Sequence, residues 1–126
     1  MVIVITGALG HIGSFLIRDL ALHFSKSELK IIMIDNLITQ RFSSLFNLPN
    51  NIKYEFVEAD VAKSDLDKIF KNIDFVIHLA AITDAAGSFE NAALVEENNF
   101  KATENVAKSC LDKFHTVNLE LNDTYS

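Results

Sequence analysis

The stretch VIVITGALGHIG, residues 2–13, joins an apolar run directly to a turn that contains three glycines. A helical pattern of apolar residues follows at once, so the stretch predicts a buried strand, a glycine turn and the start of a helix. Such a turn brings backbone N–H groups and the positive end of a helix dipole close to a bound pyrophosphate. We therefore expect a fold that binds a dinucleotide at this turn.

The turn holds three of the four glycines in the chain. Gly7 would permit the tight turn after the strand, Gly10 would leave no Cβ between the backbone and a phosphate, and Gly13 would let the helix pack closely on the strand. The alternative is a glycine-rich connection that binds nothing. The strand before the turn, the helix after it and an acidic residue at the expected distance favour the cofactor.

Beyond the turn, strand-like and helix-like patterns alternate along the chain. We expect helices over residues 12–24 and about 91–113, and strands over residues 29–34, 52–57, 74–79 and 116–121. Residues 36–51 predict a loop with one short helical turn at 42–46. The alternation predicts an α/β fold, a Rossmann-like doubly wound parallel sheet of about five strands with flanking helices, built as a single domain over residues 1–126.

Two of the helices carry more detailed expectations. The first has apolar residues at helical spacing, which predicts that one face meets the core: Ile12, Phe15, Leu16, Leu20 and Phe24. In the connection before the fourth strand, Ser64-x-x-Asp67 resembles a capping box and predicts the start of a short helix. The buried stripe of that short helix would be Leu66, Ile69 and Phe70.

The composition excludes several classes of function. The 126 residues carry a formal charge of −6 without a run of Lys or Arg, which argues against nucleic-acid and anionic-membrane partners. Cys110 is the only cysteine, so an intramolecular disulfide and a cysteine zinc cluster are excluded, and its surroundings predict a small buried side chain. We expect no metal site, no membrane span and a cytoplasmic location, and the oligomeric state stays open.

Ligands of doubly wound sheets bind beyond the carboxyl ends of the strands, here at the switch point between the first and fourth strands. Four segments follow such ends and should converge: Gly7–Gly13, Asp35-Asn36, Asp60-Val61 and Ala80-Ala81. The Asp35 carboxylate can accept hydrogen bonds from the adenosine ribose and would repel a 2′-phosphate, which favours NAD. Arg41, a few residues later, keeps NADP as the less favoured cofactor. The alternative is that Asp35-Asn36 only initiates a turn.

Several other polar residues have two interpretations. Asp60 could hydrogen-bond the adenine amino group, with Val61 near the ring, or it could simply end the third strand. His78 lies inside an apolar run, where a lone histidine is more often a hydrogen-bonded core residue than a catalyst. Asn98 is expected in mid-helix, where a surface role is the default. Tyr54 is expected to be a packed strand aromatic and not a catalytic phenol.

Taken together, these residues resemble the extended short-chain dehydrogenase/reductase superfamily, specifically its NAD-dependent epimerase/dehydratase branch, which acts on nucleotide sugars. The resemblance covers about residues 1–110 and rests on five motifs: Thr6-Gly7-x-x-Gly10-x-Ile12-Gly13, Asp35-Asn36-Leu37, Ala59-Asp60-Val61, His78-Leu79-Ala80-Ala81 and Asn98-Asn99-x-x-x-Thr103-x-Asn105. Ala102 stands where the family commonly has Gly. The resemblance implies cofactor contacts along the dinucleotide. Gly7, Gly10, His11 and Ile12 would contact the pyrophosphate, Asp35 and Asn36 the adenosine ribose, and Asp60 and Val61 the adenine. Leu79, Ala80 and Ala81 would contact the central part, and Asn98 matches the family's cofactor-contacting asparagine.

The chain departs from the family in its catalytic residues. The family oxidises a sugar hydroxyl with a Tyr whose pKa is lowered by a Lys four residues later on the same helix face. Here Tyr54 is followed at the fourth position by Glu58, and Tyr125 is followed only by Ser126. Thr124 falls near the position of the family's catalytic Ser or Thr, but we favour a frayed terminal threonine. The sequence thus resembles the cofactor-binding front half of such an enzyme, ending before the catalytic helix.

Three functions follow from this sequence. The first is the NAD-binding portion of an oxidoreductase of the nucleotide-sugar epimerase/dehydratase kind, which binds the cofactor without turnover and takes a nucleotide-sugar substrate only in a longer form. The second is a stand-alone NAD-binding sensor or regulatory module without enzyme activity. The third, ranked last, is an α/β domain whose glycine loop binds a mononucleotide or nothing.

Overall fold

The structure, a computed structural model, describes residues 1–38, 41–81 and 92–111. Its strands are β1 (Val2–Thr6), β2 (Lys30–Asp35), β3 (Lys53–Glu58) and β4 (Phe75–His78), and its helices are α1 (His11–Ala21), the 3-10 helix η1 (Phe42–Leu45) and α3 (Ala92–Leu111). The strands form one sheet in the order β3-β2-β1-β4, in which every neighbouring pair is parallel. This order confirms the predicted doubly wound α/β sheet, with β1 and β4 adjacent at the switch point.

Some predicted segments fall outside the described residues. The fifth strand expected at residues 116–121 does so, as do Asn91 and residues 112–113 at the ends of the last helix. Thr124 and Tyr125 lie outside as well. Within the parts that the structure describes, no helix is both long enough and apolar enough to cross a membrane.

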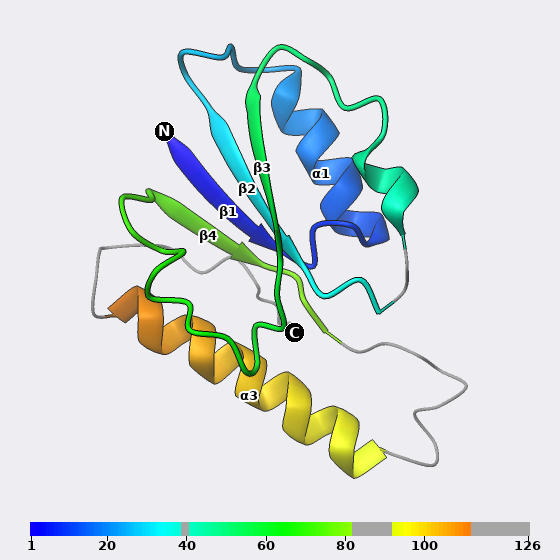
Figure 1. Cartoon of the computed structure of the whole chain (residues 1–126), viewed down its shortest axis with the longest axis vertical. Coiled ribbons are helices and arrows are strands. Elements are labelled where there is room, and N and C mark those ends of the chain that lie inside the picture. Colours follow the sequence, from blue (N-terminus) through cyan, green and yellow to red (C-terminus); the bar gives the residue numbers. More distant parts are fainter. Residues whose placement is uncertain (39–40, 82–91, 112–126) are drawn as a thin grey trace.

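Alternate residues of the central strands point to opposite faces of the sheet, so each face carries its own core. Ile3 and Ile5 of β1 pack in the cluster that contains Ile17 of α1, whereas Val4 packs in the cluster that contains Val106 of α3. Figure 1 shows α1 and η1 on one face of the sheet and α3 on the other. Full burial of one such side chain contributes about 1.5–3 kcal/mol, so these two layers hold the strand ends of the site in place.

The face that helix α1 turns to the core matches the predicted one only in part. It ends at Ala21 and not at Phe24, and its buried residues share one face: Gly13, Ile17 and Ala21. Leu16, Leu20 and Phe24 pack partly buried beside them, as predicted. Ile12 and Phe15, however, are 70% and 71% exposed, so the prediction was wrong for both. The reason is the close approach of Gly13 to the glycine turn, because residues at four-residue spacing from Gly13 then face the sheet.

The connection between β3 and β4 contains turns where a short helix was predicted. Asp60, and not Ser64, begins these turns, since its carbonyl accepts the N–H of Ser64 at 2.8 Å. The Asp67 carboxylate accepts a hydrogen bond from the hydroxyl of Ser109 on α3 at 3.0 Å. Asp67 therefore bonds to a residue distant in sequence and forms no capping box with Ser64. Leu66 and Phe70 are nevertheless buried as expected, and Ile69 is partly buried.

Candidate functional site

One cavity of about 770 Å³ lies at the carboxyl ends of the strands, a volume typical of small-ligand sites. Every residue expected to bind a cofactor lines it: Gly7, Gly10, His11, Ile12, Gly13, Asp35, Asn36, Asp60, Val61, Leu79, Ala80, Ala81 and Asn98. These residues come from the turn after β1, from the ends of β2, β3 and β4, and from α3. The fold therefore brings together segments that are far apart in the sequence, as the switch-point rule predicts.

The first turn of α1 presents backbone N–H groups to this cavity. Gly10 is the N-cap and makes no side-chain cap hydrogen bond, and no acidic side chain lies in the first turn. The N–H groups of His11, Ile12 and Gly13 have no carbonyl four residues earlier within the helix to bond to, and the helix dipole makes this end positive. The turn can therefore accept a negatively charged group, such as a pyrophosphate, by backbone contacts alone.

Two of the glycines are required by close backbone contacts. A Cβ on Gly7, whose φ is +67°, would lie 2.7 Å from the backbone C and O of Leu79. A Cβ on Gly13 would lie 2.5 Å from the Gly7 carbonyl oxygen, so the close neighbour of Gly13 is the turn itself. At Gly10 the nearest atom would be 3.3 Å away, again the Gly7 oxygen. Gly10 thus has the least structural need to be glycine, and it borders the cavity.

Asp35 holds the glycine turn as well as lining the cavity. Its Oδ2 accepts the N–H of Leu9 at 3.1 Å, and its Oδ1 accepts the N–H of Leu37 at 2.9 Å. Leu37 has a φ of 62°, a left-handed conformation that is unfavourable for leucine. An ionised carboxylate offers about four acceptor positions, so Asp35 retains capacity for a ligand hydroxyl. The turn-initiating and ligand-facing interpretations of Asp35 are therefore compatible.

Asn36 behaves in a similar way. Its Oδ1 accepts the N–H of Ile38 at 3.1 Å, which forms a side-chain turn, while the residue still lines the cavity. After β3, Asp60 Oδ1 accepts the N–H of Ala62 at 2.9 Å, so Asp60 likewise shapes its own turn. Val61 is 5% exposed and belongs to the core on the α3 side.

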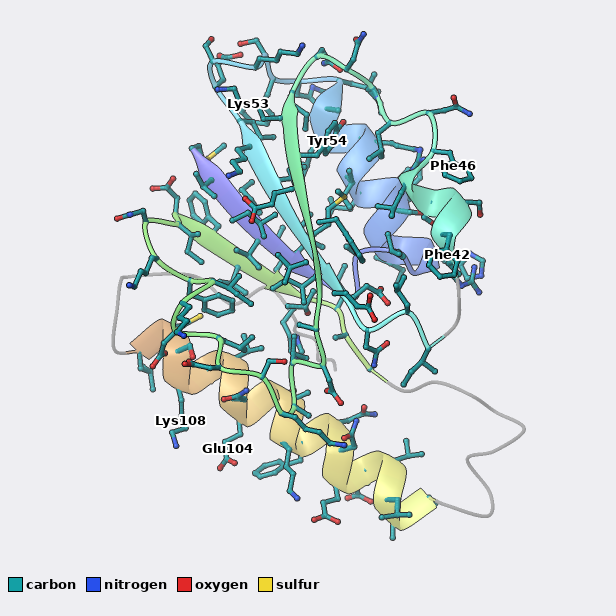
Figure 2. All side chains as sticks on the ribbon, viewed as in Figure 1. Phe42, Phe46, Lys53, Tyr54, Glu104 and Lys108 are labelled. Atoms are coloured by element: carbon teal, nitrogen blue, oxygen red, sulfur yellow. The ribbon has the colours of Figure 1, made fainter. Side chains whose placement is uncertain are left out.

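Helix α3 is attached to the wall that contains Val61. The amide nitrogen of Asn105 donates to the carbonyls of Val61 and Ser64, at 2.7 and 2.9 Å. One face of α3 reaches the cavity, where Asn98 is half-buried and forms part of the wall. Figure 2 shows Glu104 and Lys108 on the other side of this helix, pointing away from the sheet, where both are exposed.

His78 is 1% exposed and contacts side chains on both sides, Thr6 on β1 and Thr103 on α3. This confirms the prediction of a hydrogen-bonded core histidine. The residues that follow it, Leu79 and Ala80, form the cavity wall nearest to Gly7.

Sequence reasoning missed further residues of the cavity wall: Ile34, Ile38, Ala59, Asn99 and Ala102. Ile34 directly precedes Asp35, so extending that motif by one position would have found it, whereas Ala59 and Asn99 belong to the family motifs but were not assigned to the cofactor site. Arg41, considered only as a determinant of the cofactor, also lines the cavity. No local signal in the sequence points to Ile38.

Hydrogen bonds from a side chain of α1 hold the segment that contains η1. The Arg18 guanidinium donates to the carbonyls of Ser14, Ser44 and Phe46, at 3.3, 3.1 and 3.0 Å. The Ser44 hydroxyl in turn donates to the carbonyl of Leu9 in the glycine turn at 3.0 Å. Figure 2 shows Phe42 and Phe46 at the two ends of η1.

The titratable side chains with shifted pKa values are structural. The Tyr54 hydroxyl donates to the Pro49 carbonyl at 2.6 Å, and burial raises its pKa, while the Arg18 guanidinium acts in the opposite direction. A raised pKa disfavours the phenolate form, and the contact agrees with the prediction of a packed strand aromatic. Burial also raises the pKa of the Cys110 thiol, which is buried as predicted. Among the described residues, no cluster of three or more His, Cys, Asp or Glu side chains is suited to a metal ion.

Comparison with known proteins gives a consistent picture. A family model described as the NAD dependent epimerase/dehydratase family matches residues 3–119. A dTDP-D-glucose 4,6-dehydratase from Dictyostelium discoideum is 35% identical over 112 residues, which cover 86% of this chain and 25% of that protein. A putative UDP-glucose 4-epimerase from Methanocaldococcus jannaschii is 36% identical over 106 residues, which cover 82% of this chain and 32% of that protein.

The fold is similar to that of solved structures as well. The UDP-glucuronic acid 4-epimerase from Bacillus cereus, in complex with UDP-glucuronic acid and NAD, matches with a TM-score of 0.76 at 30% identity. The match covers 92% of this chain and 38% of that one. The chain thus spans between 25% and 38% of the length of these three proteins.

Proposed function

Since the chain belongs to the NAD dependent epimerase/dehydratase family, we propose that its cavity binds NAD. The observation that carries this proposal is the pairing, in one cavity, of an uncapped helix N-terminus with the Asp35 carboxylate. The first suits the pyrophosphate and the second suits the hydroxyls of the adenosine ribose. The family relative from Bacillus cereus was solved with NAD, which supports the same cofactor here.

The remaining walls would hold the other parts of the cofactor. His11 and Ile12 would lie along the pyrophosphate, and Asn36 beside the ribose. Asp60 would face the adenine amino group and Val61 the adenine ring. Leu79, Ala80, Ala81 and Asn98 would contact the central part of the dinucleotide. This assignment follows the positions of these residues around the cavity and their match to the family's motifs.

The charge of the cavity wall supports NAD over NADP. Asp35 would oppose a 2′-phosphate, because a carboxylate beside the ribose repels a second negative charge. Arg41 also lines the cavity and is the residue that would favour NADP if it reached the 2′ position. Replacing Asp35 is therefore expected to reduce the ratio of the affinity for NAD to the affinity for NADP.

We further propose that the protein is the NAD-binding portion of a nucleotide-sugar epimerase or dehydratase. NAD supplies a hydride acceptor, and the residues of this chain bind and orient it. Hydride transfer from a sugar needs a base, and no Tyr-x-x-x-Lys pair occurs in the 126 residues. Binding without turnover is the expected behaviour of this chain, and a nucleotide-sugar substrate belongs to a longer form.

A cytoplasmic location is part of the same proposal. The buried free thiol of Cys110 suits a reducing compartment. Cell fractionation followed by immunoblotting would test it, and a signal confined to a membrane or secreted fraction would contradict it.

Isothermal titration calorimetry with NAD and with NADP tests the binding proposal. NAD should bind the wild-type chain, and Gly10→Val should abolish binding while the circular dichroism spectrum stays unchanged. Glu104→Gln, on the outward side of α3, is the control and should bind as the wild type does (Figure 2). A folded wild-type sample that binds no NAD would contradict the proposal. Tighter binding of NADP than of NAD would overturn the assignment of Asp35 to the adenosine ribose. Turnover of a UDP-sugar by this chain would contradict its non-catalytic part.

A further inference from the structure

The Thr6 hydroxyl, at the end of β1, lies within hydrogen-bond distance of three partners. Thr6 is fully buried, and its Oγ1 lies 3.0 Å from the N of Leu79, 3.1 Å from the N of Ala80 and 2.6 Å from Nδ1 of His78. The Leu79 N–H is shared with the Thr6 carbonyl. The two backbone N–H groups can only donate, so they occupy the two lone pairs of the hydroxyl oxygen. The single hydroxyl proton is therefore directed to the third partner, His78 Nδ1.

This arrangement fixes the tautomer of His78. A nitrogen that accepts the Thr6 proton carries no proton of its own, so the proton of the neutral imidazole resides on Nε2. Nε2 lies 3.3 Å from Oγ1 of Thr103 on α3 and donates toward it. A proton on Nδ1 would instead point a third N–H donor at an oxygen that already accepts two.

The same contacts join three walls of the cavity. Thr6 immediately precedes Gly7, and it holds the backbone of Leu79 and Ala80, where a Cβ on Gly7 would lie only 2.7–2.8 Å away. Thr103 immediately follows Ala102, which lines the cavity from α3. His78 itself is not among the lining residues. It therefore acts on the cavity through its neighbours.

We propose that His78, held as the Nε2-protonated tautomer between Thr6 and Thr103, is a positioning residue for the cavity. Because its Nδ1 accepts the Thr6 proton, His78 orients the Thr6 hydroxyl. The Thr6 oxygen then accepts the N–H groups of Leu79 and Ala80 and holds them close to the glycine turn. Its second nitrogen aligns α3 on the opposite wall. The tautomer follows from the contacts alone, whereas the effect on the ligand rests on the proposed function, NAD binding.

The tautomer is tested without any ligand. The wild-type chain labelled with ¹⁵N in its four histidines would be compared with His78→Asn by ¹⁵N NMR at neutral pH. The signals lost in the variant should be one unprotonated nitrogen, Nδ1, and one protonated nitrogen, Nε2. A protonated Nδ1, or a doubly protonated ring, would overturn the proposal. If the wild-type chain shows the expected tautomer but binds no NAD, the proposed function fails while the tautomer assignment stands.

The positioning role is tested by a pair of substitutions at each threonine. Thr6→Val keeps the shape but removes the hydroxyl that contacts the Ala80 N–H and His78 Nδ1, so NAD should bind about tenfold or more weakly. Thr6→Ser should bind NAD within about threefold of wild type. The tautomer signature should be kept in Thr6→Ser. Equal NAD affinity in both variants would contradict the role.

Thr103→Val and Thr103→Ser repeat the comparison from α3, at the less buried end of the contacts. If Thr6→Val does not fold, these two variants still test whether His78 acts on NAD binding. Thr103→Val should weaken NAD binding with the Nδ1 signal still unprotonated, since Thr6 remains, and Thr103→Ser should restore the affinity. An affinity that does not change in Thr103→Val would mean that His78 does not act on the cavity through α3.

Discussion

The backbone N–H of Leu9, inside the glycine turn, donates to Oδ2 of Asp35 at the end of β2, over a distance of 3.1 Å. Asp35 is also the residue that we place at the adenosine ribose. Two neighbouring parts of the proposed NAD site are therefore linked by one carboxylate, because the side chain that faces the ribose also fixes the turn that faces the pyrophosphate. Substitutions at Asp35 are expected to act on both.

Asp35→Asn should reduce both stability and NAD affinity. An asparagine keeps one acceptor oxygen, but its NH₂ group would meet the N–H of either Leu9 or Leu37. Leaving such a partly buried donor unsatisfied costs about 1–3 kcal/mol of unfolding free energy, and NAD should bind about tenfold or more weakly. Urea unfolding and calorimetry measure the two effects. Asp65→Asn is the control, since its Oδ1 also accepts a backbone N–H, that of Asp67, but it does not line the cavity. An NAD affinity lowered equally in both variants would argue against the specific role of Asp35.

Gly7→Ala and Gly10→Ala should have opposite profiles. The alanine at position 7 meets the Leu79 backbone at 2.7 Å and must adopt a φ of +67°, a conformation that alone costs about 1–2 kcal/mol. The alanine at position 10 meets its nearest atom at 3.3 Å, so the melting temperature should fall little while NAD binding weakens. Thermal unfolding followed by titration with NAD separates the two. Full NAD affinity in Gly10→Ala and Gly10→Val together would show that no phosphate approaches this backbone.

Arg18→Met should loosen the η1 segment while keeping most of the apolar stem of the side chain. It removes hydrogen bonds to three carbonyls and is expected to lower stability by about 1–2 kcal/mol. Because the guanidinium lowers the pKa of Tyr54 against the effect of burial, the variant should also raise that pKa further. Alkaline absorbance titration in a Tyr125→Phe background measures Tyr54 alone. A Tyr54 titration that shifts to lower pH would contradict the assigned interaction.

Asn105→Leu should detach α3 from the wall that contains Val61. The amide bridges the carbonyls of Val61 and Ser64, and its removal should cost about 1–3 kcal/mol of stability. Amide hydrogen exchange should speed up at the β3–β4 connection more than in α1. Asn105→Gln is the matched control, since it retains the donor group on a longer stem and should recover part of the loss. Uniformly faster exchange across the sheet would indicate general destabilisation instead.

Stability should fall on the alkaline side through two acids, the buried thiol of Cys110 and the partly buried phenol of Tyr54. The folded-state pKa values of Cys110 and Tyr54 are raised above their ordinary values of 9.0 and 10.0. A group of this kind stabilises the fold fully below its unfolded pKa, and that contribution is lost as the pH rises through the folded pKa. Urea unfolding from about pH 8 to about pH 11 should show the decline, and Cys110→Ala should flatten its first part. A decline of the same slope in Cys110→Ala would exclude the thiol.

The sequence predicted the strands and the location of the cavity because both depend on local patterns. Apolar runs before Asp35 and the Leu79-Ala80 pair, and an alternating apolar and polar stretch before Asp60, mark strands and their carboxyl ends, and a parallel sheet must bring those ends together. The family motifs then named most of the wall. Ile38 escaped prediction because it reaches the cavity through the turn made by Asn36, which no periodicity reveals.

The errors have a common cause in tertiary contacts. The pattern of α1 contains two overlapping apolar stripes, and only the position of Gly13 against the turn selects the face with Ile17 over the face with Ile12 and Phe15. Likewise, Ser64-x-x-Asp67 is a valid capping signal until Ser109, far along the chain, offers Asp67 a different partner. Neither choice is decided by nearby residues.

The strand order has a consequence for synthesis on the ribosome. Of the four described strands β1 is synthesised before the others, yet it lies in the interior of the sheet between β2 and β4, and Ile3 pairs with Phe75. During elongation one edge of β1 stays unpaired until β2 has been synthesised, and the other edge stays unpaired until β4 has been synthesised. Non-local parallel pairing of this kind slows folding and exposes strand edges in the meantime. A nascent chain stalled before β4 should therefore engage chaperones through β1, whose apolar side chains later pack in the two cores of the sheet.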